Sequence, residues 1–206
     1  MIFLGTRLYM EETSKESRNA RSTALVVLNT RFIGGYKSLD DLVQNPEARS
    51  LWGNHCTFLH ISLPELHQDD ERFNPLKFVQ ETQNIMKRKK NLAIVYLNGM
   101  LLESLRKCRG PETAARYIHR TLKNSSMLLS NVIGPLEKMS ISSQPIKGLY
   151  FTGVTYPQSI TVTILSYMDE LRVTLSTEKD FINHVKFRIC VGKAFNMIFD
   201  AAVKPK

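Results

Sequence analysis

The stretch from Ser125 to Leu175 contains the densest strand-forming material in the chain. It opens SSMLLSNVIGPLEKMSI (125–141), continues with GLYFTGVTYPQ (148–158) and closes with ITVTILSYMDELRVTL (160–175). Residues 126–133 indicate a buried strand, which Gly134-Pro135 ends because proline has no N–H to donate to a neighbouring strand. The runs 160–167 and 171–176 are rich in β-branched residues and predict a hairpin with a short polar loop. Helices elsewhere in the chain are then expected to cover this sheet.

The apolar patterns along the rest of the chain predict an α/β fold with a mixed sheet covered by helices. The expected strands are 23–30, 56–63, 126–133, 148–155, 160–167 and 171–176. The expected helices are 1–12, 76–90, 92–108, 112–122 and 180–202, with a short helix at 38–43. No linker or low-complexity segment divides the chain, so we expect a single domain over residues 1–206.

The chain has 206 residues, with 28 Lys and Arg against 19 Asp and Glu, a net charge of +9. Such a balance is compatible with phosphate-bearing partners such as CoA, with anionic membrane surfaces, and equally with a solvated surface that has no partner. The basic run Lys87–Lys90 lies at the predicted end of a helix, where positive charge interacts well with the helix dipole. It is not interleaved with aromatic residues and belongs to no recognisable module, so we expect no nucleic-acid partner.

Cysteine and histidine usage argues against a metal or disulfide framework. The three cysteines are widely spaced and form no CxxC pair, which favours a reducing compartment. Cys56, His60 and His67 match no known zinc spacing, so we expect no metal site. The sequence has no G-x-S-x-G motif, no glycine-rich phosphate loop, no signal peptide and no transmembrane run. From the residues alone, it contains no self-sufficient active site.

A series of short motifs in a fixed order resembles the plant-type wax ester synthase/diacylglycerol O-acyltransferases. The motifs are FLGTRLYM (3–10), STALVVLNTR (22–31), GYKSLDDL (35–42), WGN (52–54), SNVIGP (130–135), and the terminal hairpin and helix. That family belongs to the CoA-dependent acyltransferase superfamily, with chloramphenicol acetyltransferase and the peptide-synthetase condensation domains. The resemblance implies the C-terminal lobe of a two-lobed fold.

The resemblance also implies a reaction, the transfer of a fatty acyl group from acyl-CoA to a long-chain alcohol or diacylglycerol. In the family, a histidine of an HHxxxDG motif on the N-terminal lobe removes the proton of the acceptor hydroxyl. This chain has no such motif. Its first helix also has no capping residue before it. We therefore expect the N-terminal half to be absent, the chain to be inactive alone, and its partner to be that lobe or a full-length relative. The alternative is a non-catalytic basic interaction module derived from the family.

The resemblance marks four residues as site candidates. Ser130 stands where related enzymes use Ser or Thr to hydrogen-bond the oxyanion, and Asn131 is its neighbour; a small strand residue packed under a helix is the alternative for Ser130. Gly53 and Asn54 fall in a family motif with an expected role at the lobe interface. Acyl-CoA is expected as a substrate and not as a bound cofactor. The family further implies work with a lipid acceptor at the cytoplasmic side of the endoplasmic reticulum membrane.

Overall fold

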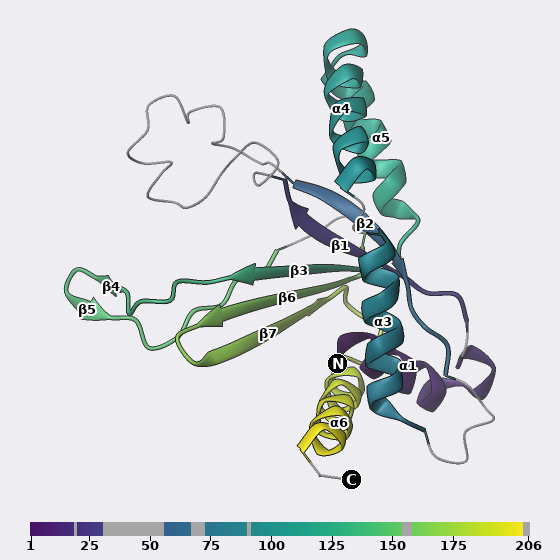
Figure 1. The fold of residues 1–206 in the computed structure, drawn as a ribbon, viewed down its shortest axis with the longest axis vertical. Coiled ribbons are helices and arrows are strands. Elements are labelled where there is room, and N and C mark those ends of the chain that lie inside the picture. Colours follow the sequence, from purple (N-terminus) through teal and green to yellow (C-terminus); the bar gives the residue numbers. More distant parts are fainter. Residues whose placement is uncertain (19, 31–55, 67–72, 90–91, 154–157, 204–206) are drawn as a thin grey trace.

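The computed structural model describes residues 1–18, 20–30, 56–66, 73–89, 92–153 and 158–203 (Figure 1). The predicted helix 38–43 and the WGN motif at 52–54 lie outside these residues. The helices are α1 (Ile2–Thr13), α3 (Pro75–Lys89), α4 (Leu92–Arg109), α5 (Pro111–Lys123) and α6 (His184–Val203), with a 3₁₀ turn at Lys15–Ser17. The strands are β1 (Thr23–Asn29), β2 (Cys56–Ser62), β3 (Met127–Ile133), β4 (Ser140–Ile141), β5 (Gln144–Pro145), β6 (Ile160–Tyr167) and β7 (Glu170–Thr177).

Five strands form one mixed sheet in the order β2-β1-β3-β6-β7. The outer pairs, β1 with β2 and β6 with β7, are antiparallel, and the central pairs, β1 with β3 and β3 with β6, are parallel. Parallel neighbours need a long crossover, and the chain between β1 and β3 supplies one that contains β2 and the helices α3, α4 and α5. The predicted mixed sheet and the predicted β6–β7 hairpin are confirmed.

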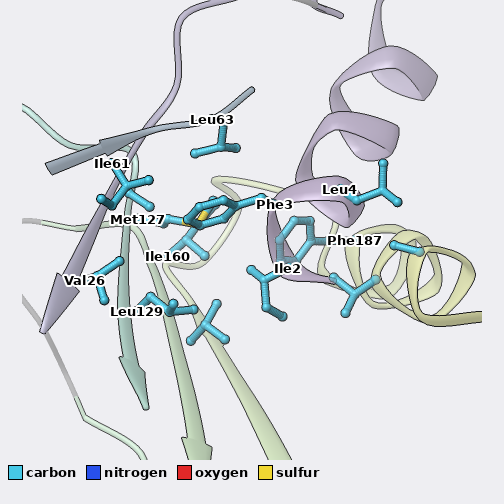
Figure 2. Close-up of a cluster of buried hydrophobic side chains, with 14 of the residues drawn as sticks. Ile2, Phe3, Leu4, Val26, Ile61, Leu63, Met127, Leu129, Ile160 and Phe187 are labelled. Atoms are coloured by element: carbon cyan, nitrogen blue, oxygen red, sulfur yellow. The ribbon is translucent and has the colours of Figure 1, made fainter. Parts of the chain in front are cut away.

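The core lies between one face of this sheet and the helices α1, α3 and α6. Alternate residues of a strand point to the same face, so β1, β3 and β6 each contribute every second side chain to it. Figure 2 shows Val26, Met127, Leu129 and Ile160 meeting the side chains of α1 and Phe187 of α6. Full burial of an aliphatic or aromatic side chain contributes about 1.5–3 kcal/mol, so this cluster is the main source of stability.

The two helices α1 and α6 approach closely at Gly5. A Cβ atom at this position would lie 2.7 Å from the Cα of Val191. Glycine is therefore needed here for backbone proximity and not for its conformational freedom.

One predicted strand is wrong. Residues 148–153 of the expected strand 148–155 form no strand in the structure. The Gly-Leu-Tyr-Phe-Thr-Gly run was expected to be a further strand, but β6 pairs with β3 on one side and with β7 on the other, and residues 148–153 pair with no described strand. Instead, the hydroxyl of Thr163 on β6 donates a hydrogen bond to the carbonyl of Phe151. The segment is thus attached to a side chain of the sheet and not to its backbone.

Two local features depart from the expected boundaries. The short β4–β5 hairpin was not predicted; its turn places Ser142 and Ser143 at positive φ. The last helix begins at His184 and not at residue 180, where Asp180 has φ +62°. Asn183 caps this helix, because its Oδ1 accepts a hydrogen bond from the backbone N–H of Lys186 at 3.0 Å.

Candidate functional site

Ser130 and Asn131 lie side by side on β3 but project from opposite faces of the sheet. Ser130 pairs with Thr163 of β6, and Asn131 pairs with Ile164. Leu129 and Ile164 belong to the face that packs on the helices, so Asn131 projects toward that face and Ser130 away from it. Asn131 is exposed and Ser130 is partly buried.

The face that carries Ser130 is crossed by the segment that follows the β4–β5 hairpin. Thr163, the strand neighbour of Ser130, is buried and binds the Phe151 carbonyl. The hydroxyl of Thr152 forms a further hydrogen bond with that of Ser176 on β7. Ser130 therefore lies next to a polar strip where the chain passes over β6 and β7.

A cavity of about 590 Å³ opens on the other face, the one to which Asn131 belongs. It lies where the start of α1 and one side of α3 meet the strands β3 and β6. The lining residues are Met1, Ile2, Phe3, Phe78, Val79, Thr82, Gln83, Met86, Lys87, Leu129 and Ile164.

The lining of this cavity is mostly hydrocarbon. Its polar members are Thr82, Gln83 and Lys87, all on α3, and the hydroxyl of Thr82 donates a hydrogen bond to the Phe78 carbonyl at 2.9 Å. A volume of this size falls within the range of about 300–1,000 Å³ typical of ligand pockets. The cavity is chemically suited to an alkyl chain, and the exposed Lys87 lies on its wall.

Phe78, Val79, Ile85 and Met86 form an apolar stripe on α3, the pattern of a buried helix face. In the structure Phe78 is buried, whereas Val79 is 37% exposed. Phe78 belongs to the core cluster and also lines the cavity, and Met86 lines the cavity and packs against the core. Val79 lines the cavity without belonging to the core cluster. Periodicity alone does not separate a core position from a cavity wall, since both need the same residue types.

Gly134 joins the end of β3 to β6 by a very close backbone contact. Its N–H donates to the hydroxyl of Ser166 at 3.2 Å. A Cβ atom at Gly134 would lie 1.9 Å from the carbonyl oxygen of Ser166, far inside contact distance. The glycine of the SNVIGP motif is therefore required by packing, and it fixes where the chain leaves the sheet beyond Ser130 and Asn131.

Arg7 is a buried cation that the sequence reasoning did not single out. Its guanidinium donates to the carbonyl oxygens of Leu63, Pro64 and Ala20 at 2.7–2.8 Å and to that of Arg18 at 3.2 Å. Burial lowers the pKa of Arg7, and the nearby Glu65 carboxylate opposes this effect. The available signal was one arginine within the apolar face of the first helix. Its hydrogen bonds to the carbonyl oxygens of Leu63 and Pro64 join α1 to the end of β2, and its Nη1 also lies 4.0 Å from the sulfur of Met10.

The remaining candidates do not form a site with Ser130 in the described residues. Gly53, Asn54 and His67 lie outside the described part of the chain. His60 is half-buried on β2, and burial, followed by the charge of Lys89, lowers its pKa. Within the described ranges, no three His, Cys, Asp or Glu side chains are grouped as metal ligands would be. None of the helices described is both long and apolar enough to cross a bilayer.

The mixed sheet and its helices define a CoA-dependent acyltransferase fold. A solved wax ester synthase/diacylglycerol acyltransferase from Marinobacter aquaeolei VT8 superposes with a TM-score of 0.55 at 13% identity. The match covers 98% of this chain and 42% of that protein. At this identity the similarity establishes the fold.

The sequence comparisons establish the family. Residues 52–199 match the model of the WS/DGAT C-terminal domain, and the chain belongs to that family. Wax ester synthase/diacylglycerol acyltransferase 4 of Arabidopsis thaliana is 26% identical over 193 residues, a match that covers 91% of this chain and 36% of the relative. Number 9 of the same series is 27% identical over 165 residues, covering 79% and 33%. The chain thus spans about a third of the length of these curated relatives.

Proposed function

We propose that this chain supplies the C-terminal lobe of an O-acyltransferase that moves a fatty acyl group from acyl-CoA to a long-chain alcohol or diacylglycerol. The family match over residues 52–199 supports the reaction class. The apolar cavity of about 590 Å³ between α1, α3 and the sheet is the observation that supports a fatty chain as ligand.

Within this proposal, the end of β3 is where the acyl carbonyl is held. The alkyl chain lies in the cavity against Leu129 and Ile164, and Asn131 follows Leu129 on the same face. The Asn131 amide is then the donor that can reach the carbonyl oxygen from the cavity side. Ser130 remains a candidate oxyanion donor from the opposite side of the strand. A single such donor is worth a factor of about 10²–10³ in rate.

The proposed reaction also needs a base, because an alcohol attacks a thioester only when its proton is removed in the transition state. The sequence contains no HHxxxDG motif. We infer that this base comes from a separate N-terminal lobe or from a full-length relative, and that residues 1–206 alone do not catalyse the transfer. The proposed place of work is the cytoplasmic side of the endoplasmic reticulum membrane, where the lipid acceptors are found.

The test is an acyltransferase assay of purified residues 1–206 with palmitoyl-CoA and either hexadecanol or diacylglycerol. The assay is run on the chain alone and with the N-terminal part of the Arabidopsis relative, which is also assayed alone. We expect product only when both parts are present. Turnover by residues 1–206 alone would show a base within this chain. If the two parts bind each other but no product forms, the chain is a non-catalytic interaction module and the proposal fails.

A further inference from the structure

The side of α3 that lines the cavity changes from apolar to cationic along the helix. Its lining residues form two rows, in each of which every fourth residue recurs. The inner row is buried or half-buried and consists of Phe78, Thr82 and Met86. The outer row is exposed and forms the rim of the cavity: Val79, Gln83 and Lys87. From Val79 to Lys87, about 12 Å along the helix, the rim therefore passes from hydrocarbon to an amide and then to a cation.

The cationic end of this rim coincides with the basic run that ends α3. Lys87, Arg88 and Lys89 are all exposed in the last turn. At 100° per residue, Lys87 and Lys89 fall within the arc of α3 that lines the cavity, whereas Arg88 falls on the opposite side of the helix. The pKa of His60 on β2 is lowered first by burial and then by the charge of Lys89, so Lys89 lies toward the sheet. Two cations of the run are thus on the cavity side.

The acidic residue of α3, Glu81, does not share this side of the helix. By the helical period it falls on the same side as Arg88, away from the cavity. Among the described residues that line the cavity, none is acidic. The C-terminal end of a helix carries only about half a negative charge, which is less than the charge of the two lysines. This end of the cavity is therefore suited to an anion, and the end at Phe78 to hydrocarbon.

We propose that Lys87 and Lys89 bind the phosphate groups of acyl-CoA, while its alkyl chain lies at the end of the cavity marked by Phe78. The inference rests on the function proposed above and adds the direction in which the substrate lies along α3. The groups of acyl-CoA follow one another as hydrocarbon, thioester, pantetheine amides and phosphates, and the rim presents Val79, Gln83 and Lys87 in the corresponding order. The Gln83 amide can both donate and accept hydrogen bonds, as an amide ligand requires. Lysine binds phosphate as a point charge.

A free fatty acid shares part of this chemistry, because it is an alkyl chain that ends in an anion. Its single carboxylate would engage the cations but would offer no amide to Gln83. Acyl-CoA matches both the amide and the cations, so we assign the anion to the phosphates of CoA.

The experiment measures binding to residues 1–206 by isothermal titration calorimetry, at ligand concentrations below micelle formation. The ligands are palmitoyl-CoA, palmitoylpantetheine, which lacks the phosphates, and palmitate. The proteins are the unaltered chain, Lys87→Gln and the matched control Arg88→Gln, which removes one charge of the same run from the far side of the helix. Both positions are exposed, so both variants are expected to keep the unfolding midpoint of the unaltered chain.

We expect Lys87→Gln to weaken the binding of palmitoyl-CoA about fivefold and to leave that of palmitoylpantetheine unchanged, and Arg88→Gln to weaken either by less than about twofold. Equal losses in the two variants, or an equal loss of palmitoylpantetheine in Lys87→Gln, would overturn the inference and leave the proposed function standing. Palmitate binding as tight as that of palmitoyl-CoA would assign the cations to a carboxylate and also overturn the inference. If neither palmitoyl thioester binds, the cavity holds no acyl chain, and the proposed function fails together with the inference.

Discussion

The Nε of Arg7 donates a hydrogen bond to the carbonyl oxygen of Pro64 at 2.7 Å, across 57 positions of sequence. With 1% of its surface exposed, this arginine is among the most deeply buried side chains described. It joins the first helix to the segment that leaves β2. Four backbone carbonyl oxygens accept hydrogen bonds from the cation, and the Glu65 carboxylate adds a favourable charge nearby.

Replacing Arg7 by Met should destabilise the chain by about 3 kcal/mol. The methionine fills part of the volume, but it leaves the carbonyl oxygens of Leu63, Pro64 and Ala20 buried without their donor. Urea unfolding followed by circular dichroism measures the change. The control is Arg21→Met, an exposed arginine of the adjacent loop, for which we expect less than about 0.5 kcal/mol. Equal effects of the two substitutions would contradict the role given to Arg7.

Gly134→Ala should be strongly destabilising, by about 2 kcal/mol or more, because the new methyl group meets the Ser166 carbonyl oxygen at 1.9 Å. Backbone atoms of a central strand cannot move away without breaking the β3–β6 pairing. Gly148→Ala is the matched control, since its methyl group meets the end of the Arg172 side chain at 2.5 Å, which can rotate away. A Gly134→Ala protein with the same free energy of unfolding as the unaltered chain would show that β3 does not end as it does in this structure.

A second glycine pair tests the contact between α1 and α6. Gly5→Ala places a methyl group 2.7 Å from the Val191 Cα and should separate the helices, at a cost of about 1–3 kcal/mol. At Gly192, on α6, a methyl group meets nothing within 4 Å. Gly192→Ala should therefore stabilise the chain by up to about 1 kcal/mol through helix propensity. Thermal unfolding measures both changes: Gly5→Ala should lower the unfolding midpoint, and Gly192→Ala should raise it. A shift in the same direction for both variants would contradict this packing of α1 on α6.

The sequence predicts the strands of the main sheet and the helices well, because each apolar pattern extends over many residues and particular residues mark where it begins or ends. Gly134-Pro135 ends β3, and Pro75 and Pro111 begin α3 and α5. It fails at 148–153, because the local pattern does not reveal which strands pair with which, and this run pairs with none of the described strands. The burial of Arg7 is set in the same way, by carbonyls far away in sequence.

The site was predictable only to the level of one strand. The motif SNVIGP marks β3, yet which of its residues faces the cavity depends on the strand's register with β6 and on where α1 and α3 lie. That Val79 and Met86 line a cavity follows from the gap left between α1, α3 and the sheet. No local pattern encodes a gap between elements, so the sequence alone gave candidates without their geometry.

His60 predicts a pH dependence of stability. Its pKa is lowered in the folded chain, first by burial and then by Lys89, whereas in the unfolded chain it titrates near about 6.5. At a pH between the folded and unfolded pKa values of His60, the unfolded chain binds more protons than the folded chain. The free energy of unfolding therefore falls as the pH decreases through this window, and His60 causes no such loss at pH values above it. Urea midpoints measured from pH 7.5 downward should decrease less for His60→Gln than for the unaltered chain. His184→Gln, at the exposed start of α6, is the control and should follow the unaltered chain.

The last prediction separates the two faces of β3 in the reconstituted enzyme, the chain combined with its N-terminal lobe. If the acyl chain occupies the cavity, the reacting carbonyl lies on the side of Asn131, because this residue shares a face with Leu129 and Ile164. Asn131→Ala should then lower kcat by a factor of about 10², and Ser130→Ala by less. Ser62→Ala, at the exposed end of β2, controls for loss of a hydroxyl elsewhere on the sheet.

The size of the acyl group gives a second measurement of the same geometry. Val79→Trp fills the cavity from α3, so it should raise KM for palmitoyl-CoA far more than for acetyl-CoA while leaving the fold intact, since Val79 is 37% exposed. A larger loss of kcat in Ser130→Ala than in Asn131→Ala, together with an unchanged KM in Val79→Trp, would place the reaction on the opposite face. The acyl carbonyl would then lie beneath the segment that Thr163 attaches to the sheet, because that segment covers the face from which Ser130 projects.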